Sequence, residues 1–140
     1  MLDARRTFKD VRVVHLGSIL PTGWPHVVPL WFVWLEDALY LTCRAGSAVA
    51  ANLERGGDTA VAISRGLSWN EHQGVLVRGR ATLLPAGHSS AKRALSAWFQ
   101  KYAAYLSGSS FARYTEEVEH PIVVKVLAQR VSLWGSPVGR

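Results

Sequence analysis

One stretch decides how this chain folds: Gly23-Trp24-Pro25-His26-Val27-Val28-Pro29-Leu30-Trp31-Phe32-Val33-Trp34. A turn of glycine and proline leads into a run, 26–34, in which both alternating sets of side chains are apolar. A strand with one face in water alternates apolar and polar residues, so this strand needs cover on both faces. One face can fill the core of the domain. We therefore expect the other face to meet a second subunit or a bound ring system.

The composition is that of an ordinary globular protein. The chain has 140 residues, of which 49% are hydrophobic and 19% charged, which suits a single domain over 1–140. No apolar run reaches the roughly 18 residues that cross a bilayer, and the N-terminal residues lack the apolar segment of a signal peptide. Cys43 is the single cysteine, so we expect no internal disulfide, no membrane partner and a cytoplasmic location.

The net charge of +6 favours anionic partners. A phosphorylated cofactor, a nucleic acid and an acidic metabolite all fit such an excess of positive charge. A solvated basic surface fits it equally well, so charge alone does not select a function.

Three strands are expected in the first third of the chain, at 11–20, 26–34 and 38–43. Tight turns at Pro21-Thr22-Gly23 and at Glu36-Asp37 separate them. Successive strands joined by tight turns predict an antiparallel meander.

Helices and further strands then alternate. Residues 47–55 suit a short helix with Ser47 as its N-cap, and strands are expected at 59–64 and 75–84. Apolar residues at three- and four-residue steps predict an amphipathic helix over 89–106, and a final strand follows at 121–134. Few helices among antiparallel strands favour a closed or nearly closed barrel with helices at its ends.

Four segments in order resemble the pyridoxamine 5'-phosphate oxidase-like superfamily. They are the Gly-x-Pro-His-Val-Val-Pro-x-Trp-Phe strand, Leu39-Tyr40-Leu41-Thr42, Gly46-Ser47-x-x-x-x-Asn52-Leu53 and Val75-x-Val77-x-Gly79-x-Ala81. The resemblance covers roughly 11–85. It implies a mainly β fold, a dimeric six-stranded antiparallel split β-barrel of Greek-key type. It also implies a cofactor, flavin mononucleotide (FMN) or the factor-420 deazaflavin.

The resemblance also implies where this cofactor lies. Its ring and ribityl chain would follow the backbone of Val27, Val28, Pro29, Leu30, Trp31 and Phe32. Thr42 would lie near the phosphate, and the helix that starts at Ser47 and carries Asn52 would point its N–H groups at it. A helix N-terminus favours phosphate through these free N–H groups and the helix dipole.

The chain departs from the family at the phosphate. Family members place a cation three residues before the Asn, often with another just before it, and these positions are Val49 and Ala48 here. Arg44 is the replacement we favour. Arg78, Arg80 or a residue of a partner chain could serve instead, or this member has changed or lost its cofactor.

The remaining candidates concern the substrate. His26, Trp69 and Trp134 are candidates for the substrate pocket, although a histidine at the start of a strand also makes local hydrogen bonds. Gly79 leaves room for a ring or relieves crowding at a bend of the barrel. The histidines show no metal-ligand spacing, and no acid–base pair stands out, so we predict neither a metal site nor a catalytic side chain.

Three functions follow. The first is a homodimeric oxidoreductase that uses FMN or the deazaflavin to transfer hydride to a small organic acceptor at the dimer interface. The second is a non-catalytic barrel that binds or sequesters a hydrophobic or tetrapyrrole ligand. The third, a single-stranded nucleic-acid module, is disfavoured because most aromatic residues lie within apolar runs and are not interleaved with Lys or Arg.

Overall fold

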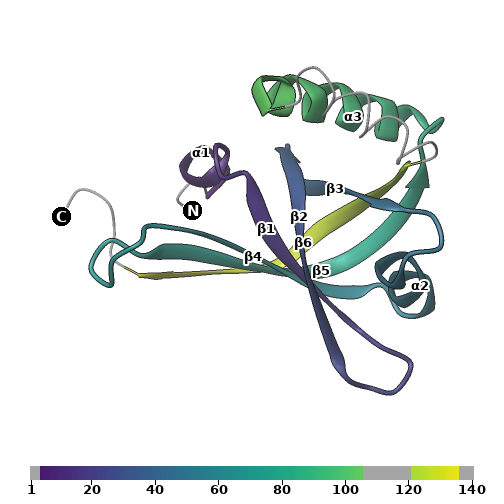
Figure 1. Cartoon of the computed structure of the whole chain (residues 1–140), viewed down its shortest axis with the longest axis horizontal. Coiled ribbons are helices and arrows are strands. Elements are labelled where there is room, and N and C mark those ends of the chain that lie inside the picture. The colour runs from purple at the N-terminus through teal and green to yellow at the C-terminus, as the bar shows by residue number, and fades with distance from the viewer. Residues whose placement is uncertain (1–3, 106–120, 136–140) are drawn as a thin grey trace.

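Six strands close into one antiparallel barrel in the order β1-β2-β3-β6-β5-β4 (Figure 1). The computed structural model describes residues 4–105 and 121–135. The strands are β1 Val13–Ile19, β2 Pro25–Leu35, β3 Ala38–Arg44, β4 Asp58–Arg65, β5 Gln73–Pro85 and β6 Pro121–Gly135. The helices are α1 Ala4–Phe8, α2 Ala48–Arg55, α3 Ser89–Tyr102 and the 3₁₀ turn η1 Ala103–Tyr105. The mainly β, six-stranded antiparallel barrel that the sequence predicted is confirmed.

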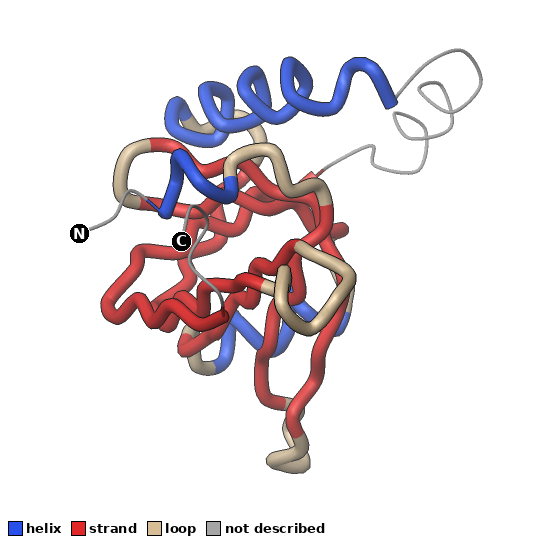
Figure 2. Tube along the Cα trace, turned by 90° about the vertical axis from the view of Figure 1, so that its left-hand side faces the viewer, coloured by secondary structure: helices blue, strands red, loops and turns tan. Residues whose placement is uncertain are grey.

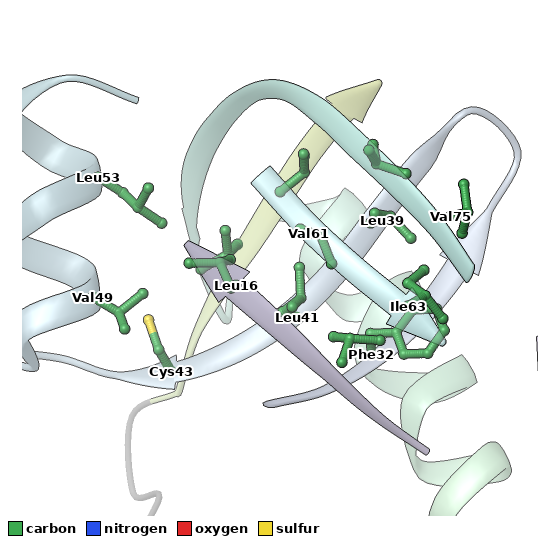
Figure 3. Close-up of a cluster of buried hydrophobic side chains, with 14 of the residues drawn as sticks. Leu16, Phe32, Leu39, Leu41, Cys43, Val49, Leu53, Val61, Ile63 and Val75 are labelled. Carbon is green, nitrogen blue, oxygen red and sulfur yellow. The ribbon is translucent and has the colours of Figure 1, made fainter. Parts of the chain in front are cut away.

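The barrel is filled by the inward set of alternating side chains. Leu16, Phe32, Leu41, Val61 and Val77 come from different strands and are fully buried, as the twofold period of a strand requires. Helix α2 lies at one end of this core, as Figure 3 shows, with side chains directed at Cys43 and Leu16. The helix therefore plugs one end of the barrel.

Strands β2 and β3 separate after a short ladder. They pair only over Phe32–Leu35 and Ala38–Leu41, whereas β1 pairs with β2 from Pro25 to Trp31. Strand β3 turns instead to β6, with which it pairs along its whole length. The first half of β2 is thus hydrogen-bonded to a strand on one edge only.

Helix α3 covers the outside of the barrel over β2, β3 and β6, where Figures 1 and 2 show it lying across the strand ends. Its Trp98 and Tyr102 are buried against Val33 and Tyr40. The ring of Trp31 stacks on Tyr102 at 4.2 Å between centroids and 8° between planes. Part of the outer face of β2 is therefore covered by α3. Among the described residues, none gives such cover to the segment before Trp31.

The end of α3 is anchored to β1 and β2 by two polar side chains. The Tyr102 hydroxyl accepts from the N–H of Phe32 at 2.9 Å and donates to the carbonyl of Arg12 at 2.7 Å. The Lys101 ammonium donates to the carbonyls of Val11 at 2.7 Å and Phe32 at 2.9 Å, and lies 3.7 Å from the Phe32 ring centroid. Burial lowers the pKa of Lys101 to about 8 and raises that of Tyr102 to about 12.

Several details differ from the sequence prediction. The N-terminal helix α1 was not predicted, and α3 ends at Tyr102 rather than at 106, which lies outside the described residues. Gly79 sits at a register shift, where a Cβ would lie 1.9 Å from the carbonyl oxygen of Leu127. This glycine therefore allows close backbone approach at a bulge.

Among the helices of the described ranges, none has the length and apolar character to traverse a lipid bilayer.

We expect Tyr102→Phe to lower the free energy of unfolding by about 1–3 kcal/mol, because it leaves a buried N–H and a carbonyl without their partner. Tyr105→Phe is the matched control, since Tyr105 is 49% exposed and no hydrogen bond of its hydroxyl occurs within the described residues. Urea unfolding measures both variants. Equal stability of Tyr102→Phe and wild type would contradict the anchoring role.

The wild type and Tyr102→Phe should also differ in how their free energy of unfolding depends on pH. The folded Tyr102 phenol keeps its proton up to a pKa of about 12, whereas an unfolded tyrosine loses it near 10.0. Rising pH in this window therefore favours the unfolded state, and the wild type loses stability that Tyr102→Phe does not lose. Parallel pH profiles of the two proteins would show that the phenol is not buried.

Candidate functional site

The open edge of β2 is the first component of the site. From Pro25 to Trp31 this strand pairs with β1 alone. On an antiparallel edge, alternate residues direct their N–H and C=O groups away from the partner strand. Backbone groups of β2 are thus available to a flat ligand along the segment where the sequence predicted the cofactor ring. Phe32 lies at the end of this segment, and Tyr102 and Lys101 already bind its backbone.

The turn from β3 to α2 supplies a place for an anion. The N–H of Ser47 donates to the carbonyl of Arg44 at 3.1 Å, and the Ser47 hydroxyl accepts from the N–H of Ala50 at 3.2 Å. This confirms Ser47 as the N-cap. In the described part of the chain, the N–H groups of Ala48 and Val49 and the exposed Arg44 guanidinium have no hydrogen-bond partner. A phosphate fits such a set of donors.

The two positions that lack the family's cation have different surroundings. Val49 is only 5% exposed and belongs to the barrel core, near Cys43 and Leu16 in Figure 3. Ala48 is exposed. Burial also raises the pKa of the Cys43 thiol, so this side chain stays a small neutral hydrophobe. Of these two positions, only Ala48 could carry an exposed cation beside the place for the anion.

Asn52 is used to hold α2 in place. Its amide nitrogen donates to the Ser18 hydroxyl at 3.1 Å, and its oxygen accepts from Arg55 at 2.9 Å. Arg55 also donates to the carbonyl of Ile19 at 2.6 Å. Asn52 thereby positions the helix whose N-terminus faces the anion place.

The other predicted residues are spread over the barrel. Thr42 lies on the same side of β3 as Arg44, while Val28 and Leu30 pack toward the core. The Trp31 indole stacks under α3, so it offers a ligand chiefly its backbone. Arg78 pairs with residue 130 of β6, nine residues beyond the partner of Arg44, or about 30 Å along that strand. One protomer does not bring Arg78 to the anion place.

The three substrate-pocket candidates are not together in one protomer. His26 lies opposite Ser18, whereas Trp134 lies opposite Gly74, which pairs with Ser64. These positions are about 16 Å apart along the strands. Trp69 is 95% exposed in the β4–β5 loop. The Nδ1 of His26 is buried and finds no hydrogen-bond partner within 4–105 and 121–135, so local bonds do not account for this histidine.

A single protomer offers a surface and not a closed slot at this place. A shallow depression with essentially no enclosed volume lies between β3 and α3, lined by Tyr40, Thr42, Leu95 and Trp98 among others. Ligand pockets usually enclose roughly 300–1,000 Å³, so this space is too small for a flavin ring. Within the described residues no group of three or more His, Cys, Asp or Glu side chains could hold a metal ion.

The sequence model of the family described as pyridoxamine 5'-phosphate oxidase matches residues 1–135. The chain belongs to this family. The match extends the resemblance, first visible over 11–85, across all six strands. No curated protein matches the chain.

Solved structures share the fold at low identity. A conserved hypothetical protein from Mycobacterium tuberculosis is 22% identical, with a TM-score of 0.78 over 96% of this chain and 85% of that one. An FAD-binding protein from Mesorhizobium loti is 18% identical, with a TM-score of 0.72 over 94% and 90%. A heme binding protein from Mycobacterium smegmatis is 21% identical, with a TM-score of 0.74 over 97% of this chain but 54% of that one. At these identities the likeness establishes the fold alone.

Sequence reasoning missed the role of Lys101 and Tyr102 and gave no weight to Arg130. The signal for these two residues was their place at the end of a predicted helix. The Tyr102 hydroxyl lies on the apolar stripe of that helix, and the Lys101 ammonium lies at its border. For Arg130 the sequence offered no comparable signal, because the final strand also carries Lys125, Gln129 and Ser132.

Proposed function

We propose that this chain is an oxidoreductase that binds FMN or the factor-420 deazaflavin and acts as a homodimer on a small organic acceptor. Two observations together carry the proposal: the open edge of β2, and an Arg44 and α2 N-terminus for which the described residues supply no partner. Membership of the pyridoxamine 5'-phosphate oxidase family supports it.

The residues of this chain would bind and orient the cofactor. Arg44 and the N–H groups of Ala48 and Val49 would hold its phosphate, with the helix dipole adding to the attraction. The backbone of 27–31 would fix the ring through groups that β3 leaves unpaired. The cofactor itself supplies hydride transfer, so the site needs no nucleophile or general base from the protein.

A second copy would cover the outer face of the barrel and close the slot. On β1 and β2 the outward side chains of Val13, Ile19 and Val27 are 44%, 53% and 62% exposed. Their cross-strand partners are Trp31, Pro25 and Gly17, in that order. Exposed apolar residues on one face of a sheet are typical of an interaction surface. Because α3 covers the other half of the outer face, the uncovered half lies beside the open edge of β2.

A non-catalytic binding role for a tetrapyrrole is the second candidate. The observation that favours it is Val49, a buried core residue that stands where the family resemblance implies a cation for the phosphate. The heme binding protein with the same fold gives this reading a structural parallel. Tight heme binding without any flavin or deazaflavin binding would select this candidate over the first.

We expect Arg44→Gln to weaken FMN binding by about tenfold to a hundredfold, because it removes a charge-assisted contact to phosphate. Ala48→Lys should strengthen binding, since position 48 is exposed at the helix N-terminus. Quenching of flavin fluorescence on titration measures both, and Arg93→Gln, far from β2's open edge and ion-paired to Glu36, is the control. If the affinities for FMN and the deazaflavin were the same in Arg44→Gln and Ala48→Lys as in the wild type, the proposed position of the phosphate would be refuted.

We expect the wild type to be a dimer and Val27→Asp to be a monomer, because the substitution places a charge on the uncovered apolar face. The variant should fold normally, since Val27 is 62% exposed in one protomer. Leu67→Asp makes the same kind of change at a fully exposed loop residue and should leave the dimer intact. Light scattering during size-exclusion chromatography gives the mass, and a monomeric wild type at micromolar concentration would exclude the dimer.

A further inference from the structure

The arginines of the described chain divide into those with partners and those without. Most have one, such as Arg65 with Gln73, Arg80 with Asp58 and Arg93 with Glu36. Within the ranges 4–105 and 121–135, the arginines that make no hydrogen bond, ion pair or ring contact are Arg44, Arg78 and Arg130. Arg44 belongs to the anion place at α2. The other two lie together elsewhere.

Arg78 and Arg130 are direct cross-strand neighbours on β5 and β6. Both are exposed, and Val77 and Gly79 on either side of Arg78 are buried, so Arg78 points away from the barrel core. Like charges directly opposite each other on two strands repel. The nearest acid on the adjoining strand, Asp58, is already bound to Arg80 at 3.3 Å. Two guanidinium groups thus lie on neighbouring strands, and the described residues supply no anion for them.

The backbone at this point is also irregular. The register shifts between Arg78 and Gly79, since their partners on β6 are residues 130 and 128, which leaves Gln129 without a partner. A bulge bends the strand and changes the direction of the neighbouring side chains. Gly79 has no space for a Cβ there, so close packing of the two backbones fixes the place where the arginine pair stands.

Small apolar residues continue from the arginine pair across the outer face. Arg78 pairs with Ala60, Ala60 with Gly17, and Gly17 with Val27. This row leads from the arginines to β2 over three strand spacings, or about 14 Å. The pair is therefore too far from β2 to share the phosphate that Arg44 would hold.

We infer that Arg78 and Arg130 form an anion site for the phosphate or carboxylate group of a small ligand whose apolar part lies over Ala60, beside the face of β1 and β2 that a second copy would cover. Two guanidinium groups can bind such a group through several charge-assisted hydrogen bonds. The flat row of alanine and glycine leaves room for a ring. This site goes beyond the proposed cofactor function and does not require a flavin.

The test is calorimetric titration of the full chain with phenyl phosphate, inorganic phosphate and benzoate, at constant ionic strength set with chloride. Saturable binding is expected, tighter for phenyl phosphate than for inorganic phosphate because the ring covers the apolar row. Comparison with benzoate shows whether the site takes a phosphate or a carboxylate. Arg78→Gln and Arg130→Gln should each weaken binding by about tenfold or more.

Two matched variants separate this site from others. Arg80→Gln removes a neighbouring exposed arginine that already has a partner and should retain phenyl phosphate binding. Arg44→Gln should remove only the part of the binding that belongs to the anion place at α2 and should leave binding at Arg78 and Arg130. In chloride alone Arg130→Gln should melt no lower than the wild type, since it relieves repulsion. Absence of saturable binding in the wild type, or loss of binding only in Arg44→Gln, would overturn the inference, and FMN binding can succeed or fail independently of either result.

Discussion

The apolar strand β2 is the constraint on which the rest of the structure depends. Its inward residues, among them Phe32, fill the barrel, and its outward residues need separate cover. The chain covers the second half itself with α3, through the stack of Trp31 on Tyr102. In the part of the chain that the structure describes, the first half has no such cover and pairs with β1 alone. Core, helix packing and candidate site thus all follow from one strand that is apolar on both faces.

Buried contacts hold α2, the helix at the candidate site, in its position. Asn52 joins Ser18 and Arg55, and this small network sets the position of α2 relative to β1. Val49 and Leu53 fix the same helix from the core side, as Figure 3 shows. The free N–H groups of the helix are therefore held rigidly next to Arg44. Rigid placement of donors is what favours an anion over water at such a place.

Much of the barrel could be predicted from the sequence because its signals are local. Ser47 caps α2, and Trp31 and Trp34 face opposite sides of β2, as their spacing requires. The cover of β2 by α3 could not be predicted, because the hydrogen bond from Phe32 to Tyr102 joins residues 70 positions apart. The pairing of Arg78 with Arg130 depends on a register shift in β6. Only the closed barrel shows which charged side chains meet.

Hydrogen–deuterium exchange with and without FMN tests most directly whether the open edge of β2 receives the cofactor. Amides of 26–31 that do not bond to β1 should exchange rapidly in the free protein and become protected with FMN, together with the first N–H groups of α2. Amides of β4, which is paired on both sides, should change little. If FMN binds but the exchange rates of the amides in 26–31 and at the start of α2 do not change, this placement of the cofactor is contradicted.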